Sequence, residues 1–150
     1  MKSRKVLGDR EGLTVIELVI TMAIIAIMVG LGLFVSLEFY RSSDLNSERD
    51  ILLSVMRRAR TQALDNVYGL QHGVFVSPSS YIIFAGSSYA SRAAQYDETF
   101  PRSNAISVSG LSEIVFSALA STSTSSGTII LADATASTTM SVNNEGQINW

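Results

Sequence analysis

The sequence has no cysteine and a single histidine, and these scarcities exclude several kinds of site. Without cysteine the chain has no disulfide framework, no thiolate nucleophile and no cysteine-ligated zinc. One histidine, His72, is too few for a two-histidine metal site. Only 16% of the residues are charged and 47% are hydrophobic, a composition too apolar for a disordered chain. A length of 150 residues suits about one domain.

Positive charge is also scarce. The chain has 11 Lys and Arg against 13 Asp and Glu, a net charge of −2. This balance argues against attraction of the whole domain to nucleic acid. His72 has no nucleophile or acidic partner at a catalytic spacing, so we expect it to be structural. The adjacent Asp97 and Glu98 lack further oxygen ligands for a cation. We therefore predict no enzyme activity, no metal and no cofactor.

An apolar run occupies most of the first 35 residues. Residues 1–12 (MKSRKVLGDREG) carry a net charge of +2, and residues 13–35 contain one ionisable residue, Glu17. A helix over the 18 residues 18–35 would be roughly 27 Å long, close to the hydrocarbon thickness of a bilayer. Because the positive flank comes first, we predict a single-pass membrane helix with a cytoplasmic N-terminus.

Glu17 is the unusual residue of this run. A carboxylate at the centre of a membrane helix costs roughly 2–3 kcal/mol, and less near the helix N-terminus, where free N–H groups favour negative charge. No Lys or Arg lies in the span to pair with it. A free α-amino group at a processed N-terminus would provide a partner.

Gly12, followed by Leu13-Thr14-Val15-Ile16-Glu17-Leu18 and a long apolar run, resembles the class III signal of type IV pilins and pseudopilins. The resemblance implies that residues 1–12 are a leader. A membrane prepilin peptidase would cleave after Gly12 and methylate the new amine of Leu13. Glu17, the fifth mature residue, would then pair with an N-terminal amine during assembly with other pilin subunits. The chain departs from the family in having Leu13 where Phe is usual.

Beyond the span, apolar residues recur at intervals of three, four or seven, as on one face of a helix that continues to about Asn66. They are Leu45, Leu52, Met56, Ala59, Ala63 and Val67, with Val55 beside them. We expect Arg57, Arg58 and Arg60 to lie on or beside the solvated face, with a nucleic-acid contact as the alternative. Residues 13–150 carry seven arginines, no lysine and 11 acidic residues, a net charge of −4. Residues 103–150 contain no Lys or Arg, so DNA is a disfavoured partner.

The rest of the chain predicts a small antiparallel sheet. Residues 72–77 and 80–86 form a hairpin around Pro78, and residues 87–110 read as a long loop. Further strands are expected at 113–117, 128–132, 138–142 and 147–150, the last after an Asn-Asn-Glu-Gly turn. Trp150 is expected to cover the core, with a partner contact as the alternative.

The predicted fold class is α+β, a long N-terminal helix packed on a small antiparallel sheet. The expected segments are the leader at 1–12, a transmembrane or filament-core helix at 13–36, an amphipathic helix at 37–67 and a β-rich head at 68–150.

Several head motifs are similar to the GspH/FimT family of minor pseudopilins. They are Arg-Arg-Ala-Arg-Thr-Gln-Ala at 57–63, a glycine at 69 or 73, Gly-Thr-Ile-Ile-Leu at 127–131 and Val-Asn-Asn-Glu-Gly-Gln-Ile at 142–148. The resemblance implies a minor subunit of a type II secretion pseudopilus or type IV pilus. It would sit in the bacterial inner membrane with its head in the periplasm before assembly. The alternatives are a signal-anchored periplasmic binding module that never polymerises, a FimT-like DNA-uptake pilin, and an anchored hydrolase.

Overall fold

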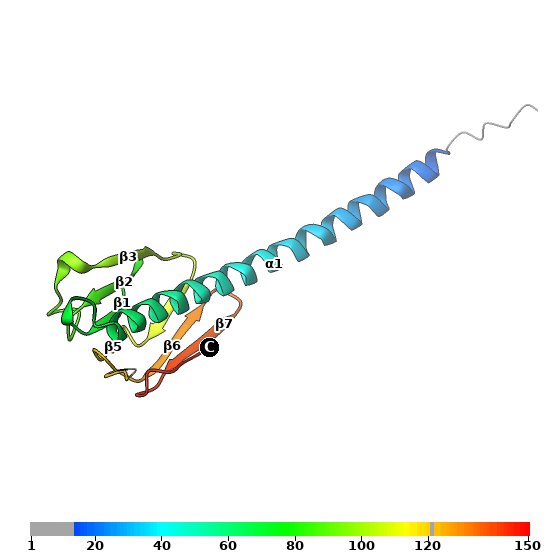
Figure 1. The fold of residues 1–150 in the computed structure, drawn as a ribbon. Coiled ribbons are helices and arrows are strands. Elements are labelled where there is room, and N and C mark those ends of the chain that lie inside the picture. Colours follow the sequence, from blue (N-terminus) through cyan, green and yellow to red (C-terminus); the bar gives the residue numbers. More distant parts are fainter. Residues whose placement is uncertain (1–13, 121) are drawn as a thin grey trace, which may run out of the picture. The chain divides into compact units, whose positions relative to one another are not determined.

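The structure is a computed structural model that describes residues 14–120 and 122–150, with the side chains of residues 33–42 left aside. One α-helix, α1 (Val15–Leu64), precedes a series of short strands (Figure 1). The chain divides into two compact units, with the boundary between Phe39 and Tyr40. The second unit, which begins at Tyr40, contains the rest of α1 and all the strands, and is called the head.

The first turn of α1 has a cap that the sequence explains. The hydroxyl oxygen of Thr14 accepts a hydrogen bond from the backbone N–H of Glu17 at 3.3 Å. Thr followed three residues later by Glu has the spacing of a capping box, which satisfies N–H groups that lack helical partners. The helix ends at Leu64, two residues before the predicted end, and Asn66 then adopts a left-handed backbone with φ 50°.

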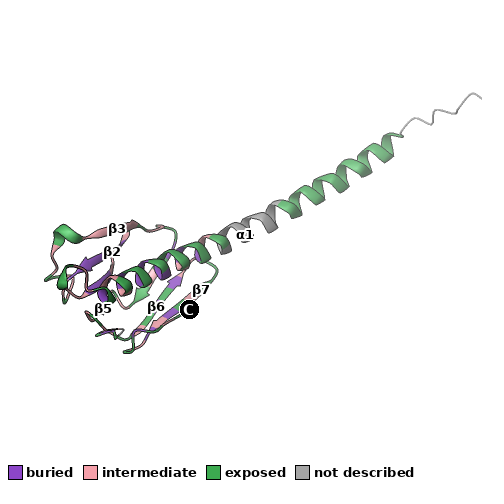
Figure 2. Cartoon of the chain, viewed as in Figure 1, coloured by how far each residue is buried: buried purple, intermediate pink, exposed green. Residues whose placement is uncertain are grey.

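The C-terminal part of α1 buries the predicted apolar face. This face is confirmed by six fully or nearly fully buried residues, Leu45, Leu52, Val55, Met56, Ala59 and Ala63. Val67 does not continue it, because it lies in the 3-10 turn η1 (Val67–Gly69) and is only half-buried. Figure 2 shows the buried residues of α1 on the side that faces the strands of the head.

Within the described residues, eight strands make two four-stranded antiparallel sheets, where the sequence predicted one. Sheet A has the order β3-β2-β1-β5 and sheet B the order β4-β6-β7-β8. The strands of sheet A are β1 (His72–Val76), β2 (Ser80–Ala85), β3 (Glu98–Pro101) and β5 (Glu113–Phe116). Those of sheet B are β4 (Ser107–Gly110), β6 (Gly127–Ala132), β7 (Ser137–Val142) and β8 (Ile148–Asn149).

The predicted hairpin is confirmed by the pairing of β1 with β2, in which Val74 lies opposite Ile83. The prediction of a long loop at 87–110 is wrong in part. This segment contains β3, β4 and the 3-10 turn η2 (Ala94–Tyr96). Its strands are short, and their Ser, Thr and Gly residues give a weak strand signal.

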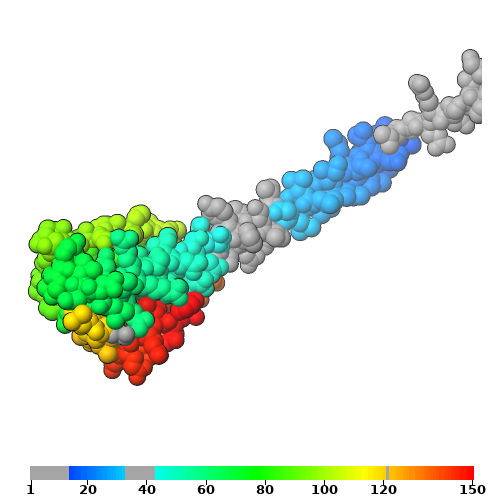
Figure 3. Space-filling view, in the orientation of Figure 1, coloured from blue at the N-terminus to red at the C-terminus, as the bar shows by residue number. Residues whose placement is uncertain are grey.

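One core joins α1 to both sheets. Its largest fully buried members include Leu52 and Met56 of α1, Tyr81 of β2, and Leu131 of β6. In the view of Figure 3, the green part of the chain, which includes β1 and β2, and the red C-terminal part lie on different sides of the head. The observed fold is therefore α+β. In the head, the C-terminal part of α1 packs against both sheets.

Candidate functional site

The first part of α1 presents a largely apolar surface. Val15–Gly32 has a mean hydropathy of 2.5, and none of its residues is buried. Ile24 and Leu31, for example, are 52% and 66% exposed. Such a surface is unfavourable in water unless lipid or another protein covers it. Among the described residues, this is the one helix long and apolar enough to span a membrane.

Glu17 is the single ionisable residue in this segment and lies in the first turn of α1. Its side chain is exposed, and no ion pair involving it occurs in the described part of the chain. The first-turn N–H groups and the helix dipole favour its negative charge. Gly12 and Leu13, the predicted processing residues, lie outside the described residues.

Arg57 and Arg58 are exposed and Arg60 is half-buried, as expected for the solvated face of the helix and its edge, but the three do not form one patch. The Arg57 guanidinium lies over the Trp150 ring, 4.7 Å from its centroid, beside sheet B. Arg58 forms an ion pair of 2.7 Å with Glu98 of β3, in sheet A. The Nε of Arg60 is buried without a hydrogen-bond partner. The structure therefore separates Arg57 from Arg58 and neutralises the latter.

The carboxylates of Asp97 and Glu98 interact with different side chains. Asp97 accepts a hydrogen bond of 2.7 Å from Nε of Arg92. Glu98 accepts one from Nε2 of Gln62 at 2.7 Å in addition to its ion pair with Arg58. In residues 14–120 and 122–150, no group of three or more His, Asp or Glu side chains is placed to hold a metal ion.

His72 lies at the start of β1 and is 2% exposed. Its Nδ1 is 3.2 Å from the carbonyl oxygen of Leu70, which is a hydrogen bond when that nitrogen is protonated. Burial lowers the pKa of His72, and the bond to Leu70 and the negative charge of Glu98 oppose this effect only in part. The imidazole is therefore held neutral inside the head.

A buried carboxylate joins α1 to the head, and the sequence analysis missed it. Glu48 is 3% exposed. Its Oε1 accepts a hydrogen bond of 2.8 Å from the hydroxyl of Tyr81, and its Oε2 accepts one of 3.3 Å from the N–H of Ser103. Burial, and then the bond to Glu48, raise the pKa of Tyr81. The missed signal was spacing, because Glu48 lies three residues after Leu45 and four before Leu52.

Trp150 does not cover the core, contrary to expectation. It is 57% exposed, and its described contact is the stacking of Arg57 on its ring. The predicted turn before it is present. Asn143 accepts a hydrogen bond of 2.8 Å from the N–H of Gln147, and Gly146 adopts φ 70°.

Comparisons with family models, with curated proteins and with solved structures gave no match. The functional conclusion therefore depends on this chain's own residues. The feature that most needs a partner is the exposed apolar surface of α1 with Glu17 in its first turn.

Proposed function

We propose that this chain is a minor pilin-like subunit that prepilin peptidase processes and that assembles with other pilin or pseudopilin subunits. The observation that carries the proposal is the wholly exposed apolar segment Val15–Gly32 with its single carboxylate, Glu17. It would serve first as a membrane anchor and later as the core of a filament. The machine would be a type II secretion pseudopilus or a type IV pilus.

The apolar segment supports both stages for the same physical reason. None of its side chains is buried, so hydrocarbon or the apolar helices of neighbouring subunits must cover them. The positive flank of residues 1–12 would hold the N-terminus in the cytoplasm before cleavage. The head would then lie on the far side of the inner membrane.

Glu17 would give the assembly step its selectivity. In a low-dielectric filament core an unpaired carboxylate is costly, whereas one that pairs with an amine is stabilised. Cleavage after Gly12 would create that amine on Leu13. The uncut chain would lack the amine at this depth, so processing would precede assembly.

Intact mass and N-terminal sequencing test the processing step. The chain is expressed with a prepilin peptidase, and Gly12→Ala is compared with Gly30→Ala, a glycine substitution elsewhere in the chain. We expect the wild type and Gly30→Ala to begin at methylated Leu13, and Gly12→Ala to stay uncut. A wild-type chain that keeps residues 1–12 beside an active peptidase would contradict the proposal and favour a signal-anchored module that never polymerises.

Cross-linking of processed chains in membranes tests the role of Glu17. We expect Glu17→Ala and Glu17→Gln to lose cross-links to neighbouring subunits, because neither side chain is charged. Asp50→Ala removes an exposed carboxylate from the same helix and should leave the cross-links unchanged. Unaltered cross-linking by Glu17→Gln would contradict the charge-pairing role while leaving the processing result intact.

A further inference from the structure

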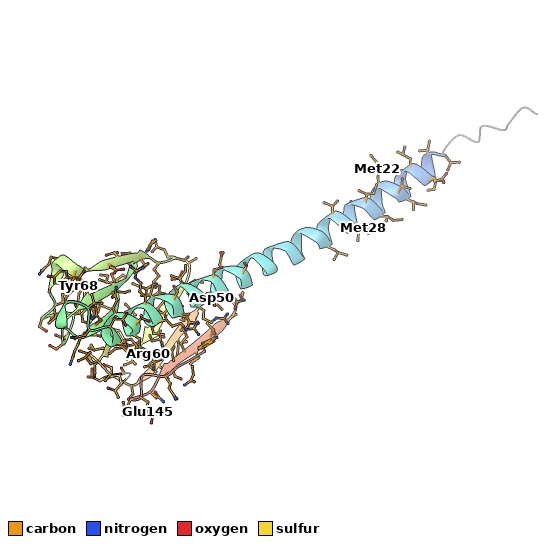
Figure 4. The ribbon with its side chains drawn as sticks, viewed as in Figure 1. Met22, Met28, Asp50, Arg60, Tyr68 and Glu145 are labelled. Atoms are coloured by element: carbon orange, nitrogen blue, oxygen red, sulfur yellow. The ribbon has the colours of Figure 1, made fainter. Side chains whose placement is uncertain are left out.

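Two stacked tyrosines lie at the surface of the head where α1 has ended. The ring centroids of Tyr68 and Tyr96 are 3.8 Å apart and the ring planes differ by 11°. Tyr68 comes from η1 and Tyr96 from η2, so two separate turns combine to present the pair. Tyr68 is 60% exposed and Tyr96 is 36% exposed. In the view of Figure 4, Tyr68 and Glu145 are labelled on different sides of the head.

The backbone at Tyr68 is strained. Its φ is 57°, a left-handed conformation that is unfavourable for a residue with a side chain. Asn66 and Gly69 on either side are also left-handed, with φ of 50° and 68°. Core packing does not offset the strain at Tyr68, because most of its ring is outside the core. The main effect of this backbone is to hold an aromatic ring at the surface.

A cavity of about 500 Å³ is lined by residues that lie next to each tyrosine along the chain, and not by the tyrosines themselves. Gly69, which follows Tyr68, lines it, and so does Ala93, whose carbonyl accepts a hydrogen bond of 3.0 Å from the N–H of Tyr96. The hydrogen bond of 2.7 Å from Gly86 N–H to the Gln71 carbonyl ties its two sides together. Its polar lining side chains are Gln71, Ser87, Ser91 and Arg92. We call the tyrosine pair and this cavity the tyrosine site.

The tyrosine site carries little net charge. Arg92 is paired with Asp97 through a 2.7 Å contact, and its Nη1 donates to the carbonyl of Tyr89 at 2.8 Å. The nearby His72 ring, 6.3 Å from that of Tyr68, is held neutral by burial. A phosphate or carboxylate ligand would therefore find no free positive charge here. Hydroxyl and amide groups remain, with Ser87 and Ser91 already within 3.2 Å of each other.

We propose that the tyrosine site binds a neutral saccharide. A sugar ring has an apolar face of C–H groups that stacks on an aromatic ring, and hydroxyl groups at its edge that bond to serine and amide side chains. The tyrosine site offers exposed rings near a cavity of the size that small ligands use, and a few polar side chains line that cavity. The proposal concerns the head and is independent of processing and assembly.

Titration of the full-length chain with three named sugars tests the proposal. The protein is kept in dodecylphosphocholine, which has no sugar headgroup, and maltotriose, cellotriose and tri-N-acetylchitotriose are added in turn. We expect at least one sugar to shift the aromatic NMR resonances of Tyr68 and Tyr96 in a saturable way. Absence of such a shift with all three sugars would overturn the proposal.

Tyr68→Gly separates binding from folding. Glycine adopts a left-handed backbone without strain, so we expect an unchanged or higher Tm together with binding weakened about tenfold, the size of a lost stacking contact. Tyr96→Phe keeps the stacked ring and should bind within about threefold of the wild type, less than the loss expected for a stacking contact. Trp150→Ala removes an exposed aromatic side chain elsewhere and should leave the affinity unchanged. Binding by Tyr68→Gly at wild-type strength would overturn the proposal.

Discussion

At the scale of one residue, the position of Gly73 in β1 has no room for a side chain. A Cβ atom there would lie 2.6 Å from the carbonyl oxygen of Ile114 and would collide with the ring of Phe84. Gly69, the other glycine singled out in the sequence, is needed for a different reason, its φ of 68°. The sequence indicated a glycine near this strand, but the two positions have separate causes. The pairing of β1 with β2 and β5 explains Gly73, and the left-handed backbone explains Gly69.

His72 gives the head a pH dependence whose sign follows from its burial. Because the pKa is lower in the folded state than the ordinary value near 6.5, the unfolded state binds more protons as the pH falls below that value. The free energy of unfolding should therefore decrease from about pH 6.5 downwards, until the folded-state pKa is passed. Above pH 6.5 His72 should contribute no pH dependence.

Urea unfolding of the full-length protein at pH 5.5 and pH 7.5 checks this prediction. His72→Asn retains an amide donor near the Leu70 carbonyl but does not titrate in this range. We expect a smaller loss of stability on acidification in His72→Asn than in the wild type. Since the carboxylates titrate in both proteins, the difference between them isolates His72. An equal loss in both would show that His72 does not contribute.

At the scale of the element, α1 joins two different surfaces. Its first part is apolar and exposed, and its last part is apolar on the side that enters the core. The spacing of Leu52, Met56 and Ala59 was sufficient to predict the second surface. It did not predict that Glu48 is buried among apolar residues, because the partners of this carboxylate come from β2 and from the chain after β3.

Glu48→Ala should destabilise the head by about 2–4 kcal/mol, because it leaves the Tyr81 hydroxyl and the Ser103 N–H without their acceptor. Urea unfolding followed by near-ultraviolet circular dichroism measures the change. Asp50→Ala is the matched control, since its ion pair with Arg49 lies at the surface and should contribute less than about 1 kcal/mol. Equal effects of the two substitutions would show that the Glu48 hydrogen bonds contribute little.

The positions of the strands were predictable where the local sequence contains both a strand pattern and a turn signal. The β1–β2 hairpin follows from β-branched and aromatic residues on either side of a Ser-Pro-Ser-Ser turn, and β7 and β8 follow from the turn at Asn143–Gly146. The division into two sheets was not predictable in this way. It depends on β5 pairing with β1, in which Ile114 lies opposite Val74, 40 positions earlier. Such distant pairing leaves no local pattern.

At the scale of the whole molecule, the exposed apolar segment should hold the chain in membranes. We expect the wild type to stay in the membrane fraction after an alkaline wash. Ile25→Arg places a charge within the segment, at a cost of about 2.5–3.5 kcal/mol on insertion scales, and should release part of the chain. Ser54→Arg, an exposed position of α1 in the head, should not. Release of the wild type by the wash would contradict membrane spanning.

The candidate sites differ in how far the sequence reveals them. Glu17 was recognisable because a carboxylate is rare in an apolar run. The tyrosine site was not, because Tyr68 and Tyr96 are 28 positions apart and flank no recognisable motif. Their stacking depends on how η1 and η2 lie in the folded head.

The alternation of strands between the two sheets has a consequence for how the chain is made. During synthesis β4 appears before β5, yet β5 completes sheet A, and β4 must wait for β6 to provide its neighbour. Once β5 has emerged, sheet A has all four of its strands, whereas β4 still has no neighbour. Pairing in sheet B starts only when β6 follows, and β8 completes that sheet. The head is therefore made in two stages, and β4 stays unpaired in the interval between them.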